Sequence, residues 1–297
     1  MIPDTASTNT ATTLRHGAEA LAQSLPPLMA SAEQLAATVL LGDHGRRRSG
    51  RGDEFWQYRP AAPGDEARTI DWRRSARSDQ HFIREKEWQA AQSVLIWVDP
   101  GPSMQFSGAA AHPTKGDRAK LLAMAAAVLL IRGGERVGLS GLDTPPRSGQ
   151  HQMLRLAAAL LVAGADEYPS PEVRGILPHS RALFASDFLG DIAAAETALT
   201  AAADRGVRGA LLQVLDRVEE EFPFDGRTIF TSMAGGLRHE TLKAGDLRRR
   251  YLDRLAERKD RLAALARATG WLYLCHHTND PAQGALLWLY HALERGA

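Results

Sequence analysis

Strands and helices alternate along this chain from about residue 91 onward, and this alternation limits its fold more than any other feature. Apolar runs bounded by polar or turn residues are typical of buried strands, and we expect strands at 93–98, 136–142, 181–186, 207–215 and 271–275. Helical patterns lie between them, at 117–132, 150–162, 191–203, 246–269 and 281–293. The order predicts an α/β fold with a doubly wound, mostly parallel sheet and helices on both faces.

The part of the chain before this alternation differs in character. Residues 1–43 carry a weak helical pattern and predict an N-terminal helical region. Residues 44–90 interleave arginines with aromatic side chains and are punctuated by glycine and proline, which is typical of short strands and tight turns. We therefore expect a β-rich Arg/Trp segment over 44–90, packed on an α/β domain over 91–297.

Composition excludes several classes of protein. The single cysteine, Cys275, excludes an internal disulfide framework and a multi-cysteine metal site. A formal net charge of +1 gives no general attraction to nucleic acid or to an anionic membrane. The longest apolar run, 121–131, is far shorter than the roughly 20 residues of a membrane span, and no signal peptide pattern is visible. We expect a cytoplasmic protein with no membrane span.

Two of the expected strands end in aspartate. Asp99 follows the first strand and Asp187 follows the third, while Ser103 lies on the turn four residues after Asp99. Carboxylate and hydroxyl oxygens are ligands that Mg²⁺ accepts, so Asp99, Ser103 and Asp187 form a candidate metal site at the strand ends. The alternative is that Asp99 caps the following turn and that Asp187 caps the next helix.

A longer motif carries a family resemblance. It includes Pro63-Gly64-Asp65, Arg68, Ile70-Asp71-Trp72 and Ala76-Arg77, and it is followed by the Asp99/Ser103 loop and by the turn at 221–227. With these residues the chain resembles the bacterial domain-of-unknown-function 58 family over roughly residues 45–297. The strand-end pattern, Asp-x-x-x-Ser with a later Ser-Asp, resembles a von Willebrand factor A domain.

The resemblance implies a fold, a role and partners. It implies a von Willebrand factor A-like domain that binds partner proteins and is not an enzyme. Members of this bacterial family are typically associated with MoxR-type AAA+ ATPases, as accessory or adaptor proteins. The expected role is therefore chaperone-like folding, assembly or metal loading of client proteins together with such an ATPase.

The metal motif of the A-type domain is incomplete here. That motif holds a metal through two serines, a threonine and aspartate, whereas this chain has Gly101 at one serine position. No threonine occurs at 162–167, where the family has one, although Asp166 or Glu167 could substitute for it. We expect a degenerate site, with weak or absent Mg²⁺ binding, that still contacts partners.

The arginines of the Arg/Trp segment have two interpretations. The first is structural, with guanidinium groups that pair with Asp65, Asp71 and Asp79 while the aromatic rings pack. In the second, an acidic protein partner binds at Arg73, Arg74 and Arg77, since arginine fits carboxylate groups well.

Two other functions and one further cluster complete the hypotheses. One alternative is a metal-dependent hydrolase that uses Asp99 and Asp187; the other is a nucleic-acid-binding protein that uses the Arg-rich segment. No P-loop motif occurs, so the chain is not itself a P-loop ATPase. Cys275-His276-His277 lies at a strand end, but adjacent histidines point to opposite faces, and we expect a buried thiol with a partly exposed histidine pair.

Overall fold

The computed structural model describes residues 27–39, 49–62, 65–66, 70–77, 80–87 and 91–294. The chain divides into two compact units: one is Leu41–Ala91, and the other combines Met1–Leu40 with Gln92–Ala297. Most of the expected N-terminal helical region, 1–26 and 40–43, lies outside the described residues, whereas 27–37 form a helix.

The larger unit is built on a sheet of five strands in the order β4-β3-β5-β6-β9, and each neighbouring pair is parallel. The central strands are continuous apolar runs because helices cover both of their faces. The expected parallel sheet is confirmed, and its strands are β3 (Ser93–Val98), β4 (Arg136–Leu139), β5 (Arg181–Ser186), β6 (Arg208–Leu215) and β9 (Leu272–His277).

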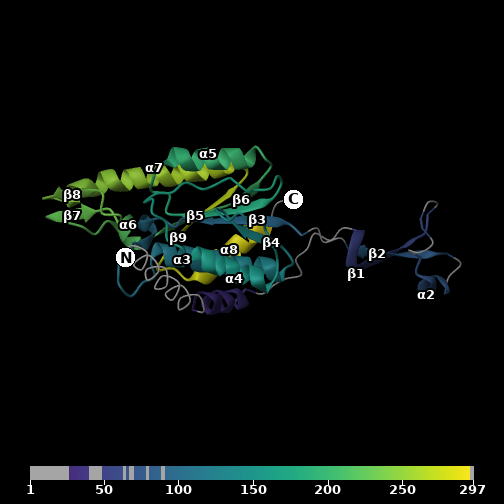
Figure 1. Ribbon diagram of the computed structural model, residues 1–297. Helices are drawn as coiled ribbons and strands as arrows, with labels where there is room; N and C mark the ends of the chain where they lie inside the picture. Colours follow the sequence, from purple (N-terminus) through teal and green to yellow (C-terminus); the bar gives the residue numbers. More distant parts are fainter. Residues whose placement is uncertain are drawn as a thin grey trace, which may run out of the picture. The chain divides into compact units, whose positions relative to one another are not determined.

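Helices cover the sheet on two sides (Figure 1). One layer contains α3 (Lys115–Arg132), α4 (Gln150–Leu160) and α8 (Ala282–Glu294); the other contains α5 (Ile192–Ala203) and α7 (Gly245–Thr269). Alternate residues of β3 serve the two cores, with Val94 and Ile96 in the first and Leu95 and Trp97 in the second. The doubly wound arrangement is therefore confirmed.

The apolar run 121–131 lies inside α3, and α3 is the central helix of the first layer. Most of its side chains are buried against β3 and α8. No helix among the described residues is long and apolar enough to cross a membrane. The N-terminal helix adds Ala32 and Ala36 to the same core.

A short insertion between β6 and α7 was not expected from the sequence. It consists of α6 (Arg217–Glu221) and a hairpin of β7 (Thr228–Thr231) with β8 (Arg238–Thr241). The hairpin is largely exposed and has no continuous apolar run, so hydrophobic periodicity does not reveal it. Phe222 and Phe230 stack at 5.7 Å between ring centroids, and Phe222 also contacts Tyr251 of α7.

The smaller unit pairs β1 (Ser49–Pro60) with β2 (Phe82–Glu87) in antiparallel register, with the short helix α2 (Trp72–Ser75) between them. Asp71 caps α2, because its Oδ1 accepts a hydrogen bond from the Arg74 amide at 3.0 Å. Arg59 donates two hydrogen bonds of 2.7 Å to the carboxylate of Asp65 and closes the turn that follows β1. Several residues of the family-like motif thus hold this unit together.

Candidate functional site

The strand order places the candidate site at a topological switch point. The chain leaves β3 toward β4 on one side and returns to β5 on the other, so the loops after β3 and β5 diverge at the carboxyl edge of the sheet. Asp99 directly follows β3 and Asp187 directly follows β5, and both are buried. The structure therefore brings these two predicted site residues together.

Asp99 has hydrogen-bond donors on both of its carboxylate oxygens. Gly101 donates its amide to Oδ1 at 2.7 Å, and Ser186 donates its hydroxyl to Oδ2 at 2.6 Å. Burial raises the pKa of Asp99 from 3.8 to about 6, although these two hydrogen bonds oppose the change. The carboxylate caps the turn after β3, as the structural alternative from the sequence predicted, whereas α5 is capped by Asp191 and not by Asp187.

A buried ammonium group lies beside Asp187. Lys115 is 1% exposed, and its Nζ donates to Asp187 Oδ2 at 2.8 Å and to Glu219 Oε1 at 2.7 Å. Burial by itself lowers the pKa of Lys115, but the two carboxylates outweigh it and raise the pKa above its ordinary value. The strand ends thus contain a positive charge that belongs to the chain itself.

Helix capping positions two members of this ion-pair network, Lys115 and Glu219. Lys115 is the first residue of α3, and the hydroxyl of the N-cap residue Thr114 accepts a hydrogen bond from the Asp117 amide. Glu219 belongs to a capping box at the start of α6, where its Oε2 accepts the amide of Asp216 at 2.9 Å. Sequence reasoning missed Lys115 and Glu219, although the spacing from Asp216 to Glu219 is a recognisable capping signal.

The serine positions of the metal motif differ from a complete site. Ser103 is 5% exposed, and its Oγ has no hydrogen-bond partner among the described residues. A Cβ atom at Gly101 would lie 2.6 Å from the carbonyl oxygen of Glu167 and 2.7 Å from Cδ of Pro169. The loop around Glu167 therefore occupies the space that a serine at position 101 would need.

This donor set suits an ammonium group better than a divalent cation. Both oxygens of Asp99 already accept hydrogen bonds, and Asp187 divides its oxygens between Lys115 and the Leu189 amide. Asp166 is exposed and Glu167 contacts the Ala234 amide, so neither replaces the missing threonine in this arrangement. The Mg²⁺ site stays a prediction that the geometry does not favour.

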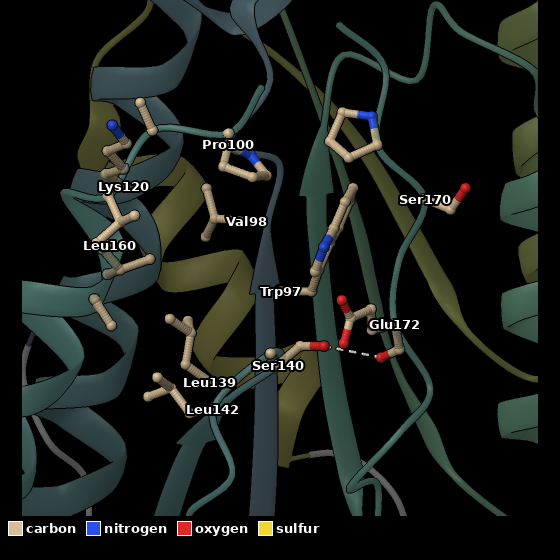
Figure 2. Close-up of a pocket in the computed structure, with 16 residues that line it drawn as sticks. Trp97, Val98, Pro100, Lys120, Leu139, Ser140, Leu142, Leu160, Ser170 and Glu172 are labelled. Carbon is tan, nitrogen blue, oxygen red and sulfur yellow. Dashed lines mark hydrogen bonds between the residues drawn. The ribbon is translucent and has the colours of Figure 1, made fainter. Parts of the chain in front are cut away.

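Two cavities flank the loop that follows α4. One, of about 210 Å³, is lined by Asp99 and Asp187 together with Tyr168 and the start of α5. The other, of about 300 Å³, is mostly apolar and lies between the end of β3 and α4 (Figure 2). In this second cavity Ser140 donates its hydroxyl to the carbonyl oxygen of Glu172 at 2.9 Å. Pro169 and Ser170 line both cavities.

The predicted partner-binding arginines are exposed on the smaller unit. Arg74 has a structural contact, since its guanidinium carbon lies 5.4 Å from the ring centroid of Tyr58 and 5.7 Å from that of Phe82. Arg73 and Arg77 are exposed and form no ion pair within the part of the chain that the structure describes. Trp72 beside them is 58% exposed. Asp79, one of the expected arginine partners, lies outside the described residues.

These features define an open, doubly wound α/β protein with a polar, ion-paired centre at its switch point. The model of the family described as "Protein of unknown function DUF58" matches residues 57–261, so the chain belongs to that family. The match begins within β1 and includes the rest of the Arg/Trp segment and most of the α/β unit.

Similar chains occur in mycobacteria. "Uncharacterized protein Rv1480" of Mycobacterium tuberculosis and "Uncharacterized protein Mb1516" of Mycobacterium bovis are each 29% identical to this chain over 239 residues. The alignment covers 74% of this chain and 73% of each relative.

Two solved structures resemble part of the fold. A conserved hypothetical protein BatB from Bacteroides thetaiotaomicron is 17% identical, with a TM-score of 0.41. An aerotolerance-related membrane protein from Bacteroides fragilis is 14% identical, with a TM-score of 0.40. Each match covers 69% of this chain and 100% of the other.

Proposed function

We propose that this protein is a non-enzymatic, von Willebrand factor A-like adaptor of a MoxR-type AAA+ ATPase in the cytoplasm. Its role is to present client proteins for folding, assembly or metal loading. The observation that carries the proposal is Lys115, whose ammonium group lies between Asp187 and Glu219 where an A-type domain would use a metal. Because Lys115 supplies the positive charge at this position, it supports a binding surface that works without a metal.

Two surfaces are available for the two kinds of partner. The cavity beside Asp99 and Tyr168 is open at the carboxyl edge of the sheet, the edge at which doubly wound folds bind ligands. On the smaller unit, Arg73 and Arg77 present planar cations next to an exposed tryptophan, a combination that suits an acidic protein surface. We assign the ATPase to the arginine surface and the client to the strand-end cavity.

A binding assay with the MoxR-type ATPase of the same genome tests the proposal. The ATPase is titrated with labelled wild-type protein and with the double variant Arg73→Glu/Arg77→Glu, with ATP and Mg²⁺ present. We expect saturable binding that the double variant weakens at least tenfold, because both charges are reversed on one exposed surface. The double variant Arg249→Glu/Arg250→Glu on the exposed side of α7 makes the same charge change and should bind like wild type. Absence of binding by wild type would overturn the proposal.

The same material separates the two rival functions. A hydrolase that uses Asp99 and Asp187 requires a divalent ion, so calorimetry with Mg²⁺, Mn²⁺ and Ca²⁺ should show binding that Asp187→Asn abolishes. A nucleic-acid-binding protein should shift labelled DNA or RNA at low salt and lose affinity steeply as salt rises. We expect neither result from the wild-type protein.

A further inference from the structure

A second polar cluster lies at the edge strand of the sheet, apart from the Lys115 centre. Cys275 and His277 are two residues apart on β9, so their side chains point to the same face of the strand. Glu220 of α6 faces them, and Lys259 of α7 forms an ion pair with Glu220. All three elements meet near the carboxyl end of β9.

The ligand atoms of three of these residues converge. One atom each from Glu220, Cys275 and His277 lie within 4.8 Å of one another, and all three side chains are only partly buried. Ligand atoms bound to one tetrahedral zinc ion lie about 3.3–3.8 Å apart, given metal–ligand bonds of about 2.0–2.3 Å. Side-chain movements well under 1 Å per residue would therefore let all three reach a common ion.

His277 and Glu220 already form a direct contact with each other. Nε2 of His277 lies 2.7 Å from Oε2 of Glu220, yet this nitrogen has no hydrogen-bond partner among the described residues. At such a short separation, the oxygen must lie well away from the direction in which the ring N–H would point. These two atoms must therefore separate from 2.7 Å to about 3.3 Å before both can bind one zinc ion.

Asp280 lies on the other side of the imidazole ring. Its Oδ2 is 3.4 Å from Nδ1 of His277, close enough to attract a proton on that nitrogen. A carboxylate at Nδ1 favours the tautomer whose Nε2 carries a free lone pair, and zinc-binding histidines commonly have such a partner. The ring is thus oriented with Nε2 toward Glu220.

From this convergence we propose a transition-metal site of the zinc class, formed by Cys275 Sγ, His277 Nε2 and Glu220 Oε2, with water as the fourth ligand. The mixture of thiolate, imidazole and carboxylate excludes Mg²⁺ and Ca²⁺, which select oxygen, and suits Zn²⁺ or Co²⁺. Binding replaces the thiol proton of Cys275 with the metal, and that proton goes to solvent.

The ammonium group of Lys259 competes with a metal ion for this cluster. Its ammonium group pairs with Oε1 of Glu220 and also contacts Cys275, so it neutralises the cluster when no metal is bound. Because Lys259 uses Oε1, a metal would contact Oε2, the oxygen that otherwise pairs with His277. His276, which faces the opposite side of β9 and is buried, cannot take part. This assigns a role to Cys275 and His277 beyond the buried thiol and histidine pair expected from the sequence.

Cobalt titration of tag-free, metal-stripped protein tests the site. Thiolate ligation gives Co²⁺ an intense near-ultraviolet charge-transfer band, which carboxylate and imidazole ligands alone do not produce. We expect wild type to develop this band with one equivalent of Co²⁺, and Zn²⁺ to displace it. Cys275→Ser should lose the band, and Asp280→Asn should weaken Co²⁺ binding by about 10–100-fold.

Three further variants keep the outcome interpretable. His277→Gln should lose the stoichiometric binding, whereas His276→Gln, one residue away on the other face, should keep it. Lys259→Met should bind Co²⁺ more tightly than wild type, because it removes the competing cation. A wild-type protein and a Lys259→Met variant that both stay colourless with excess Co²⁺ would overturn the proposal. The result is independent of ATPase binding, which needs neither Cys275 nor His277.

Discussion

Nζ of Lys115 lies 2.8 Å from Oδ2 of Asp187, and this contact joins the start of α3 to the end of β5 across 72 positions of the sequence. Glu219 completes the network from α6, with its Oε1 2.7 Å from the same nitrogen. A lysine is fully buried only where its charge is paired, so this network determines how the strand ends are built.

Lys115→Met should strongly destabilise the α/β unit. The variant leaves the buried carboxylates of Asp187 and Glu219 without their partner, and breaking such a buried pair costs about 3–5 kcal/mol. Urea unfolding followed by circular dichroism measures the loss. Lys243→Met, at an exposed position, is the control and should change stability by less than about 0.5 kcal/mol.

A second variant checks the cause of that loss. In Lys115→Met/Glu219→Gln one of the two unpaired charges is removed, so we expect part of the stability to return. If the double variant were less stable than Lys115→Met alone, lost packing of the lysine stem rather than unpaired charge would be the cause.

Gly101→Ser restores the serine of the complete metal motif but should not restore a metal site. The new Cβ would lie 2.6 Å from the Glu167 carbonyl oxygen, and such overpacking costs about 1–3 kcal/mol. We expect a lower unfolding midpoint and no heat of Mg²⁺ binding in calorimetry. Gly236→Ser, where a Cβ meets nothing within 4 Å, is the matched control. A stable variant that binds Mg²⁺ would contradict this account of Gly101.

Asp99→Asn should flatten the pH dependence of stability in the acid range. Burial raises the pKa of Asp99 from 3.8 to about 6, so the folded state keeps a proton that the unfolded state has released. The contribution of Asp99 to folding stability is fully present below its pKa in the unfolded chain. It is lost as the pH rises through its folded-state pKa of about 6. Relative to wild type, the variant should gain up to about 3 kcal/mol between about pH 4 and pH 7. Denaturant unfolding at several pH values measures the difference.

The pKa of Asp65 is shifted in the opposite direction from that of Asp99. Its hydrogen bond from Arg59 and that from the Ala62 amide lower its pKa from 3.8 to about 2. Its contribution to the turn is therefore present above the unfolded pKa and is lost as the pH falls toward 2. Carboxyl-detected NMR on wild type and on Arg59→Lys measures the titration. The variant, which cannot form the two-pronged contact, should titrate closer to the ordinary value.

Much of the α/β framework could be predicted from local pattern. The strands 93–98 and 181–186 match β3 and β5, and the apolar run within 117–132 predicts most of α3. These elements are long and buried, so their hydrophobic period is strong. The β7–β8 hairpin was missed because its strands are short and half exposed. Aromatic contacts between Phe222, Phe230 and α7 stabilise it, and these are tertiary.

The sequence by itself determined the doubly wound class and placed Asp99 and Asp187 at the ends of two parallel strands. Only the tertiary structure decided which cation meets them. A lysine at a helix start normally has its ammonium group in water, and nothing local to Thr114-Lys115 indicates burial. Its partners lie 72 and 104 residues away and approach only when β5 pairs with β3 and β6 pairs with β5. A long-range ion pair depends on that assembly, and a local pattern carries no information about it.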